Sequence, residues 1–187
     1  MDRYQDIRLL PDPEFAPQVL LNYLFGRLHR ALAGIDNREI GISFPEVASD
    51  RPWLGQRLRL HGTAANLDKL QALGWAGHMC DHVSMGSMAE VPNGVRHRVV
   101  RRVQAKSSPE RLRRRLMKRK GIAYGEARRL IPDSAAQTLA LPFITSRSRS
   151  TGHNFHLFVE HGPLQDQQVE GEFNSYGLSA GATVPWF

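Results

Sequence analysis

The sequence predicts an α+β protein, and three observations lead to this fold class. Several short segments alternate apolar and polar residues, which is the period of half-buried β-strands. Other segments repeat apolar residues every three or four positions, as amphipathic helices do. The order of these elements over roughly residues 3–92 is β-α-β-β-α-β, which is the ferredoxin-like arrangement.

Proline and glycine mark the ends of the predicted N-terminal elements. A strand over 4–10 stops at Pro11, and a helix over 14–33 is expected to stop at Gly34. The apolar stripe of this helix holds Leu20, Leu24, Leu28 and Ala31, widened by Leu21, Phe25 and Leu32. The other elements of this half are strands over 39–44, 57–62 and 82–91 and a short helix over 66–73.

A second domain is predicted after residues 92–94, where Pro, Asn and Gly follow one another. The predicted domains are therefore 1–94 and 95–187. The second begins with an extended segment over 95–106. It continues with helices over 109–121 and 124–131, a candidate helix near 134–139, and strand candidates over 143–148, 154–160 and 172–178.

The composition is that of a globular chain, because 41% of its 187 residues are hydrophobic and 23% are charged. No apolar run approaches the ~20 residues that cross a bilayer, and the polar start of the chain is unlike a secretory signal. A single cysteine, Cys80, excludes an intramolecular disulfide framework and indicates a reducing compartment. We therefore expect a cytoplasmic protein that does not bind a membrane.

Positive charge is concentrated in one segment of the chain. In total, 25 Lys and Arg stand against 18 Asp and Glu, a net charge of +7. Fourteen of these cations lie between residues 96 and 129 beside only two acidic residues, Glu110 and Glu126, so this segment carries +12 and the remainder −5. On a surface helix with so few acidic neighbours, the basic side chains repel one another unless anions bind nearby. We therefore expect a nucleic acid partner at one face, and charge alone leaves RNA or DNA open.

Within this segment, a helix from Pro109 to Lys120 would place most of its cations on one face. At three- and four-residue spacing, this face holds Arg111, Arg114, Arg115, Lys118 and Arg119. Leu112 and Leu116 lie on a separate stripe and are expected to anchor the helix to the rest of the protein. Arginine offers paired donors that match phosphate oxygens and the O6/N7 edge of guanine. The pattern is a strong indication of nucleic acid binding, but only a weak indication that a particular nucleotide sequence is recognised.

Three further features fit nucleic acid binding, although each also fits an ordinary structural role. Arg102 and Gln104 are two residues apart in an extended segment, so both side chains point the same way, toward guanine and adenine edges or toward solvent. The tract 146–151 alternates serine with arginine and can hold a ribose and a phosphate, or form a surface loop. Phe155 can stack on a base, or pack in the core.

Histidine supplies the candidate acid–base chemistry and one candidate metal site. His29 lies at the edge of the first helix's apolar stripe, where spacing alone favours a structural role. His78, Cys80 and His82 would share a face if this segment were a strand, but no second Cys or His cluster completes a zinc site. The sequence also lacks a Walker loop and an H-E-x-x-H motif. If the protein is a nuclease, we therefore expect it to work without a bound metal or other cofactor.

Five motifs, in order along nearly the whole chain, resemble one family. They are Y-x-D-I-R-L-x-P-D-P-E-F from Tyr4, R-V-Q-A-K-S-x-P-E-R-L-R-R-R-L-M from Arg102, L-P-F-x-T-x-R-S-x-S-T-G from Leu141, H-G-P-L from His161, and V-P-W-F at the end. The family is the CRISPR repeat-processing endoribonuclease of the type I-F (Yersinia-subtype) system. The glycine-rich loop of the broader group of repeat-cleaving ribonucleases is reduced here to scattered glycines.

The resemblance implies an N-terminal ferredoxin-like domain and a less regular, distorted ferredoxin-like C-terminal domain with an arginine-rich helix. This helix is implied to lie along the major groove of the CRISPR repeat RNA hairpin. Arg102 and Gln104 match positions that read a guanine and an adenine at the base of the stem, and Phe155 matches an aromatic that stacks beneath the terminal base pair. The implied RNA-binding residues are Arg102, Gln104, Lys106, Arg111, Arg114, Arg115, Lys118, Arg119, Thr151 and Phe155.

The resemblance also implies a mechanism without metal. The ribose 2′-hydroxyl attacks the adjacent phosphate and leaves a 2′,3′-cyclic phosphate and a 5′-hydroxyl. His29 is implied as the base and Ser148 as the residue that holds the 2′-hydroxyl. Ser150 is implied to steady the phosphate or sugar, and Tyr176 to orient His29. After cleavage the protein, itself a monomer, is implied to stay on the guide RNA and to join the other Cas subunits of the surveillance complex.

Two other functions stay open on the sequence. A non-catalytic RNA-hairpin-binding subunit of a ribonucleoprotein explains the charge and the fold, but gives His29, Ser148 and Ser150 no joint purpose. A DNA-binding regulator is the weaker alternative, because no helix-turn-helix pattern occurs.

Overall fold

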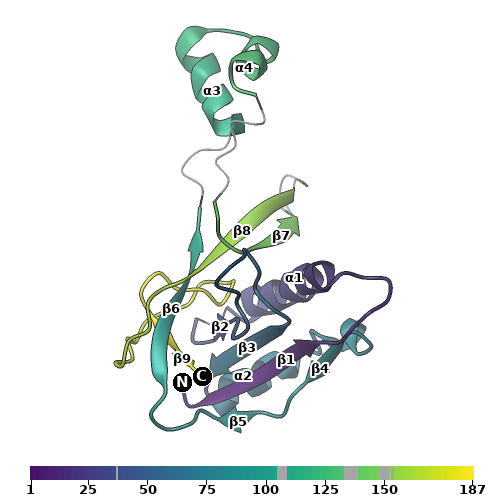
Figure 1. Ribbon diagram of the computed structural model, residues 1–187, viewed down its shortest axis with the longest axis vertical. Helices are drawn as coiled ribbons and strands as arrows, with labels where there is room; N and C mark the ends of the chain where they lie inside the picture. The colour runs from purple at the N-terminus through teal and green to yellow at the C-terminus, as the bar shows by residue number, and fades with distance from the viewer. Residues whose placement is uncertain (37, 105–108, 133–138, 148–151, 153) are drawn as a thin grey trace. The chain divides into compact units, whose positions relative to one another are not determined.

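The computed structural model describes residues 1–36, 38–104, 109–132, 139–147, 152 and 154–187 (Figure 1). It forms two compact units. We call Met1–Val103 together with Leu141–Phe187 the body, and Gln104–Ala140 the helical unit. The predicted α+β class is confirmed, with two antiparallel sheets and four α-helices among these residues. The predicted boundary at residue 94 falls within the body, and the division into domains 1–94 and 95–187 stays a prediction.

The first sheet has the ferredoxin-like topology that the sequence predicts. Its strands follow the spatial order β2-β3-β1-β4, and every pair is antiparallel. The elements are β1 (Arg3–Leu9), α1 (Pro17–Ile35), β2 (Gly41–Ser43), β3 (Arg57–Gly62), α2 (Ala64–Gln71) and β4 (Val83–Met85). The strand expected over 82–91 is split, because only the short β5 (Ala89–Glu90) follows β4, and it pairs with the other end of β1.

The core of the body packs one face of α1 against both sheets. The predicted apolar stripe is buried and comprises Leu20, Leu21, Leu24, Phe25, Leu28, Ala31 and Leu32. It belongs to a single cluster with Ile7, Leu58 and Leu60 of the first sheet and with Leu157 and Val159 of the second. Burying one such side chain contributes about 1.5–3 kcal/mol, so α1 is held firmly in the body.

The ends of α1 differ from the predicted ones. Asp12 Oδ1 accepts hydrogen bonds from the backbone N–H groups of Glu14 and Phe15, and the resulting turn delays the helix until Pro17. The expected stop at Gly34 is wrong, since the helix continues to Ile35. It ends at Asp36, which adopts a left-handed conformation with φ 44°. Aspartate tolerates this conformation better than most residues, so glycine is not required there.

The second sheet has the order β7-β8-β6-β9 and is also antiparallel. Its strands are β6 (Arg96–Val103), β7 (Phe143–Arg147), β8 (Asn154–His161) and β9 (Thr183–Trp186). The strand expected over 172–178 is wrong, because this segment forms a turn. No strand is predicted over the residues of β9, which contains Pro185. A strand with proline is tolerated at a sheet edge, which is the position that β9 occupies.

The opening and closing motifs of the chain meet in the body. The Arg59 guanidinium donates to both carboxylate oxygens of Asp6, at 2.6 and 2.9 Å, and to the Phe187 carbonyl at 2.9 Å. Its central carbon lies 4.6 Å from the centre of the Tyr4 ring and 3.9 Å from that of Phe187. Tyr4 and Asp6 of the opening motif and Phe187 of the closing motif therefore serve the packing of the body.

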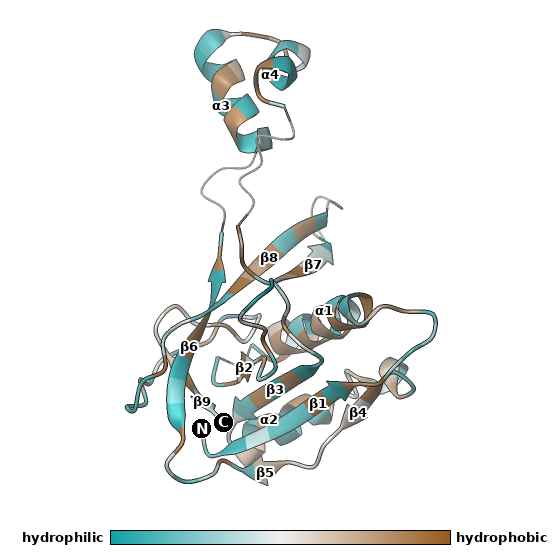
Figure 2. Cartoon of the chain, viewed as in Figure 1, coloured by the Kyte–Doolittle hydropathy of each residue, from teal (hydrophilic) through white to brown (hydrophobic). Residues whose placement is uncertain are grey.

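The helical unit contains α3 (Pro109–Lys120) and α4 (Tyr124–Leu130), close to the predicted bounds. Gly121 follows α3 with φ 67°, and its N–H donates to the Met117 carbonyl, so glycine ends this helix. The helix expected near 134–139 lies almost wholly outside the described residues. Most residues of α3 are hydrophilic (Figure 2). Among the residues that the structure describes, no helix has the length and apolar character of a membrane span.

Candidate active site

His29 is held in one orientation by a backbone carbonyl. It lies in the sixth position before the end of α1, and its ring atom Nδ1 is 2.8 Å from the carbonyl oxygen of Ser175. A carbonyl oxygen can only accept, so Nδ1 carries the proton and donates it. In the neutral ring the other nitrogen, Nε2, is then unprotonated and can take a proton from a ligand. The geometry therefore leaves Nε2 as the ring atom of His29 that is able to accept a proton.

Tyr176 stacks on the His29 ring. The two ring centres are 4.0 Å apart and the planes differ by 11°, while Phe25 lies beyond the tyrosine at 6.1 Å in a nearly parallel plane. Phe25 comes from the preceding turn of α1 and is buried in the core. The imidazole is therefore positioned by the tyrosine ring, which is itself supported by the core.

The turn that carries Ser175 and Tyr176 is specified by two residues. Asn174 Oδ1 accepts from the backbone N–H groups of Tyr176 and Leu178 at 2.9 and 3.3 Å. Gly177 has φ 71°, and its carbonyl accepts from the N–H of Ile42 in β2. A Cβ atom on Gly177 would lie only 2.6 Å from the Ile42 side chain, so the close approach needs glycine.

Arg102 and Phe155 lie beside this stack. The guanidinium carbon of Arg102 on β6 is 5.4 Å from the centre of the Tyr176 ring and 5.7 Å from that of Phe155 on β8. Its Nε atom is buried without a hydrogen-bond partner among the described residues. The structure therefore brings together four predicted site residues of the body, namely His29, Arg102, Phe155 and Tyr176.

Strand β7 runs along α1 toward His29. The carbonyl of Phe143 accepts from the Gln18 side chain at 3.1 Å, and the N–H of Thr145 donates to Asn22 Oδ1 at 2.9 Å. Both segments thus advance in the same direction along their contact, and β7 ends at Arg147. The predicted residues Ser148, Ser150 and Thr151 come directly after it and lie outside the described residues, as does Lys106.

In the helical unit, the predicted cationic side chains are exposed on α3. They are Arg111, Arg114, Arg115, Lys118 and Arg119. Arg113 differs, because it is buried and its Nε donates to the carbonyl of Ile131 at 2.8 Å. Leu112 and Leu116 are half-buried and line a hollow of about 540 Å³ together with Arg115, Arg119 and Ile131. Gln104 is exposed at the start of this unit.

The candidate zinc residues His78, Cys80 and His82 do not lie on a strand. The strand that would have brought their side chains to one face does not form, because Gly77–Met79 is a 3₁₀ turn, and Cys80 is exposed after it. His82 Nδ1 instead lies 2.7 Å from Asp12 Oδ2. The N–H groups of Glu14 and Phe15, and then His82, lower the pKa of Asp12. Within the described ranges, no three His, Cys, Asp or Glu residues gather in a way that could hold a metal ion.

Two contributors to the site were missed by the sequence interpretation. Ser175 acts through its main-chain carbonyl, for which its side chain gives no signal. Gly177, however, stands three residues after Asn174, and this spacing of turn formers should have predicted a turn over 174–178 in place of a strand.

Comparison with known proteins gives a consistent result over the full chain. The family model of the CRISPR-associated protein Cas_Csy4 matches residues 4–187. The CRISPR-associated endonuclease Cas6/Csy4 of Pseudomonas aeruginosa (strain UCBPP-PA14) is 53% identical over 187 residues, which is the whole of both chains. The CRISPR-associated endonuclease Cas6/Csy4 of Escherichia coli (strain UTI89 / UPEC) is 44% identical, also over the whole of both chains.

The fold and these full-length matches place the protein in the class of CRISPR-associated endonucleases. More narrowly, the chain belongs to the Cas_Csy4 family. The resemblance to the type I-F repeat-processing enzymes that the five motifs indicate is therefore confirmed.

Proposed function

We propose that the protein cleaves the CRISPR repeat hairpin of precursor RNA, by attack of a ribose 2′-hydroxyl on the adjacent phosphate. A bond forms between O2′ and phosphorus while the bond from phosphorus to O5′ breaks, and O5′ takes up a proton. The products are a 2′,3′-cyclic phosphate on the hairpin side and a 5′-hydroxyl on the released strand. In this proposal no metal ion takes part, because the attacking group belongs to the substrate and a histidine takes its proton.

The observation that carries this proposal is the fixed orientation of His29. Its Nδ1–H donates to the Ser175 carbonyl and its ring stacks on Tyr176, so Nε2 is left as the proton acceptor. An imidazole has an unperturbed pKa of about 6.5, close to working pH, and general base catalysis contributes about 10²–10⁴-fold. Tyr176 then acts as a positioning residue that sets the plane of the base.

The serine residues after β7 complete the proposed site. Strand β7 advances along α1 in the direction of His29 and ends at Arg147, which precedes Ser148 in the sequence. In our proposal Ser148 holds the attacking 2′-hydroxyl, while Ser150 and Thr151 steady the phosphate and sugar. Such positioning can raise the rate of the reaction by several orders of magnitude when the reacting atoms are held in line.

Recognition of the hairpin is assigned to the remaining predicted residues. Arg102 and Gln104 read a guanine and an adenine at the base of the stem, and Phe155 stacks beneath the terminal base pair. The cations of α3, with Lys106 before it, contact phosphates along the major groove. This groove is too narrow for side chains in a long A-form duplex, so the proposal requires a short stem that is open near its loop. Exposure of these cations on one short helix supports the assignment.

Further expectations follow from the family. We propose that the protein, a monomer, stays on the product hairpin and joins other Cas subunits in the cytoplasm. The strong phosphate contacts of the hairpin side would make release of this product slow.

The test is cleavage of a labelled repeat hairpin in buffer with EDTA. We expect wild-type protein to cut it and to leave a cyclic phosphate, identified by mass spectrometry. A substrate with hydrogen in place of the single 2′-hydroxyl upstream of the cut should bind equally well but stay intact.

Three results would contradict the proposal. Cleavage of the deoxy substrate would rule out the mechanism, and loss of wild-type activity in EDTA would require a metal. Tight binding without any cleavage would favour a non-catalytic RNA-binding subunit.

A further inference from the structure

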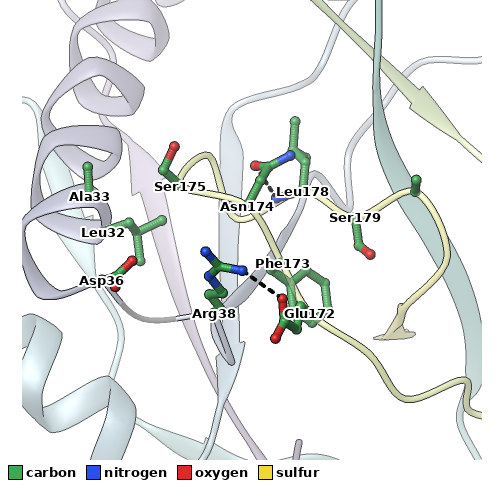
Figure 3. A pocket seen from close by; sticks show the side chains of 11 residues that line it. Leu32, Ala33, Asp36, Arg38, Glu172, Phe173, Asn174, Ser175, Leu178 and Ser179 are labelled. Carbon is green, nitrogen blue, oxygen red and sulfur yellow. Dashed lines mark hydrogen bonds and ion pairs between the residues drawn. The ribbon is translucent and has the colours of Figure 1, made fainter.

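A polar pocket lies beside the His29–Ser175 contact. It has a volume of about 480 Å³, within the range of sites for small ligands. The last turn of α1 forms one wall, and the segment 172–180, which begins with Glu172, forms another. Arg38 lies between them (Figure 3). All of its lining residues belong to the body.

The pocket is one helical turn from the proposed base. Ala33 lines it and lies four residues after His29 on the same face of α1, a displacement of about 6 Å along the helix axis. Ser175 also lines it, and this is the residue whose carbonyl holds His29. The pocket is therefore close enough to His29 to accept a nucleotide next to the scissile phosphate.

The charge of the lining differs sharply from that of α3. Its charged side chains are Asp36, Arg38 and Glu172, which sum to −1. Arg38 Nη1 donates to Glu172 Oε2 at 2.9 Å, and this hydrogen bond, with the nearby charges of Glu172 and Asp36, raises the pKa of Arg38. Arg38, the only cation among the described residues of the lining, is thus already paired. Such a surface does not attract phosphate, but its carboxylates can accept hydrogen bonds from the amino groups of a base.

Neutral polar groups add to this hydrogen-bonding capacity. Ser179 Oγ accepts from the N–H groups of Gly181 and Ala182 at 3.3 and 3.0 Å, so its hydroxyl proton is directed elsewhere. Asn174 uses its Oδ1 atom in the turn, so it can serve a ligand only through its amide NH₂ group. Donors and acceptors therefore converge on a space large enough for one nucleoside.

We propose that this pocket binds the ribonucleotide immediately downstream of the cut, which is the first nucleotide of the strand that leaves. The inference rests on the proposed function above and extends it to a second subsite. The chemistry agrees with the charge, because the scissile phosphate stays with the hairpin and the departing nucleotide ends in a neutral 5′-hydroxyl. The pocket thus orients O5′ during the reaction and afterwards holds a nucleotide without a 5′-phosphate, while the cationic side keeps the hairpin.

The first experiment uses the wild-type protein and two RNA hairpins. They are identical except that the nucleotide downstream of the cut carries a base in one and is abasic in the other. We expect single-turnover cleavage of the abasic substrate to be slower by about tenfold or more, since loss of one orienting contact misplaces the leaving oxygen. Equal rates for the two substrates would overturn the proposal.

The second experiment fills the pocket with Ala33→Trp, with Ala65→Trp on the exposed side of α2 as the matched control. We expect A33W to cut the base-containing substrate as slowly as wild type cuts the abasic one, with no further loss on the abasic substrate. A65W should match wild type on both. Full-speed cleavage by A33W would contradict occupancy of the pocket. Affinity for the product hairpin should stay within about twofold, because the hairpin does not enter the pocket.

The two proposals fail in different ways. If wild-type protein cuts neither hairpin, the proposed endoribonuclease activity is wrong. If it cuts both hairpins equally fast, that activity stands and only the downstream subsite is wrong.

Discussion

The site around His29 and the cationic face of α3 are built in opposite ways. The His29 site joins residues 146 positions apart, and its parts are a main-chain carbonyl, a stacked ring and a glycine turn against a buried core. The cationic face comes from one helix of twelve residues. Of the described residues in the helical unit, only Arg113 and Ala127 are buried. The position of the His29 side chain thus depends on the tertiary structure, whereas the cationic face of α3 depends on little more than the formation of one helix.

The difference follows from the distance dependence of each interaction. Proton transfer requires the base within hydrogen-bonding distance of its target, so a displacement of about 1 Å matters. Attraction between a cation and a polyanion acts over about 10 Å at physiological salt, and several cations share the effect. Changes at His29 and at the turn that supports it should therefore reduce the rate of cleavage, and changes on α3 should reduce binding.

The largest expected effect is that of His29→Ala. We expect a loss of about 10²–10⁴-fold in single-turnover cleavage, with hairpin affinity unchanged, because only the base is removed. His78→Ala, an exposed histidine outside the site, is the control and should cut at the wild-type rate. A parallel loss of affinity in His29→Ala would break the proposed separation between positioning and binding.

The next largest effect is expected from Gly177→Ala. The substitution strains the backbone, because φ is 71° at this position. It also places a methyl group 2.6 Å from the Ile42 side chain, so the turn that carries Ser175 and Tyr176 must shift. We expect cleavage to fall by about ten- to hundredfold.

Gly94→Ala is the matched control for this shift. Gly94 has φ 73° but nothing within 4 Å of a Cβ, so the control has the same backbone strain without the contact. If both variants cleave equally well, the turn does not position His29.

Arg115→Ala and Arg119→Ala should have smaller effects, of about five- to tenfold, on hairpin affinity. Each should also flatten the slope of log affinity against log salt by about one unit or less, as one phosphate contact is lost. The rate of the bound complex should not change. Lys69→Ala on α2 is the control. An unchanged slope would remove these arginines from the phosphate-binding face.

The smallest expected effect is on the stability of the body at acid pH. Burial, and then the charge of Arg98, lowers the pKa of His161 to about 4. The unfolded chain, with a histidine pKa near 6.5, binds more protons between these values, so stability should fall as pH decreases from about 6.5 to 4.

Tryptophan fluorescence can follow this transition in the body alone, because Trp53, Trp75 and Trp186 all lie there. In urea denaturation, His161→Gln should show a weaker dependence of the midpoint on pH. An equal pH dependence in the variant would show that another group controls acid unfolding.

Much of the fold could be predicted because its signals are local. Apolar spacing placed the buried face of α1, and proline or glycine marked the ends of most elements. The failures occurred where local signals conflict with tertiary contacts. Residues 172–178 alternate like a strand but turn at Asn174 and Gly177, and β9 forms despite Pro185 because it lies at an edge.

By itself, the sequence determined the family, the ferredoxin-like order of elements and the cationic face of α3, since each depends on residue types at short spacings. Only the tertiary structure decided which nitrogen of His29 accepts a proton, because that choice depends on a carbonyl 146 residues away. It also decided that the pocket beside His29 is acidic, since its walls come from distant segments. Short-range patterns specify elements, whereas the orientation of a reactive atom is set by packing between them.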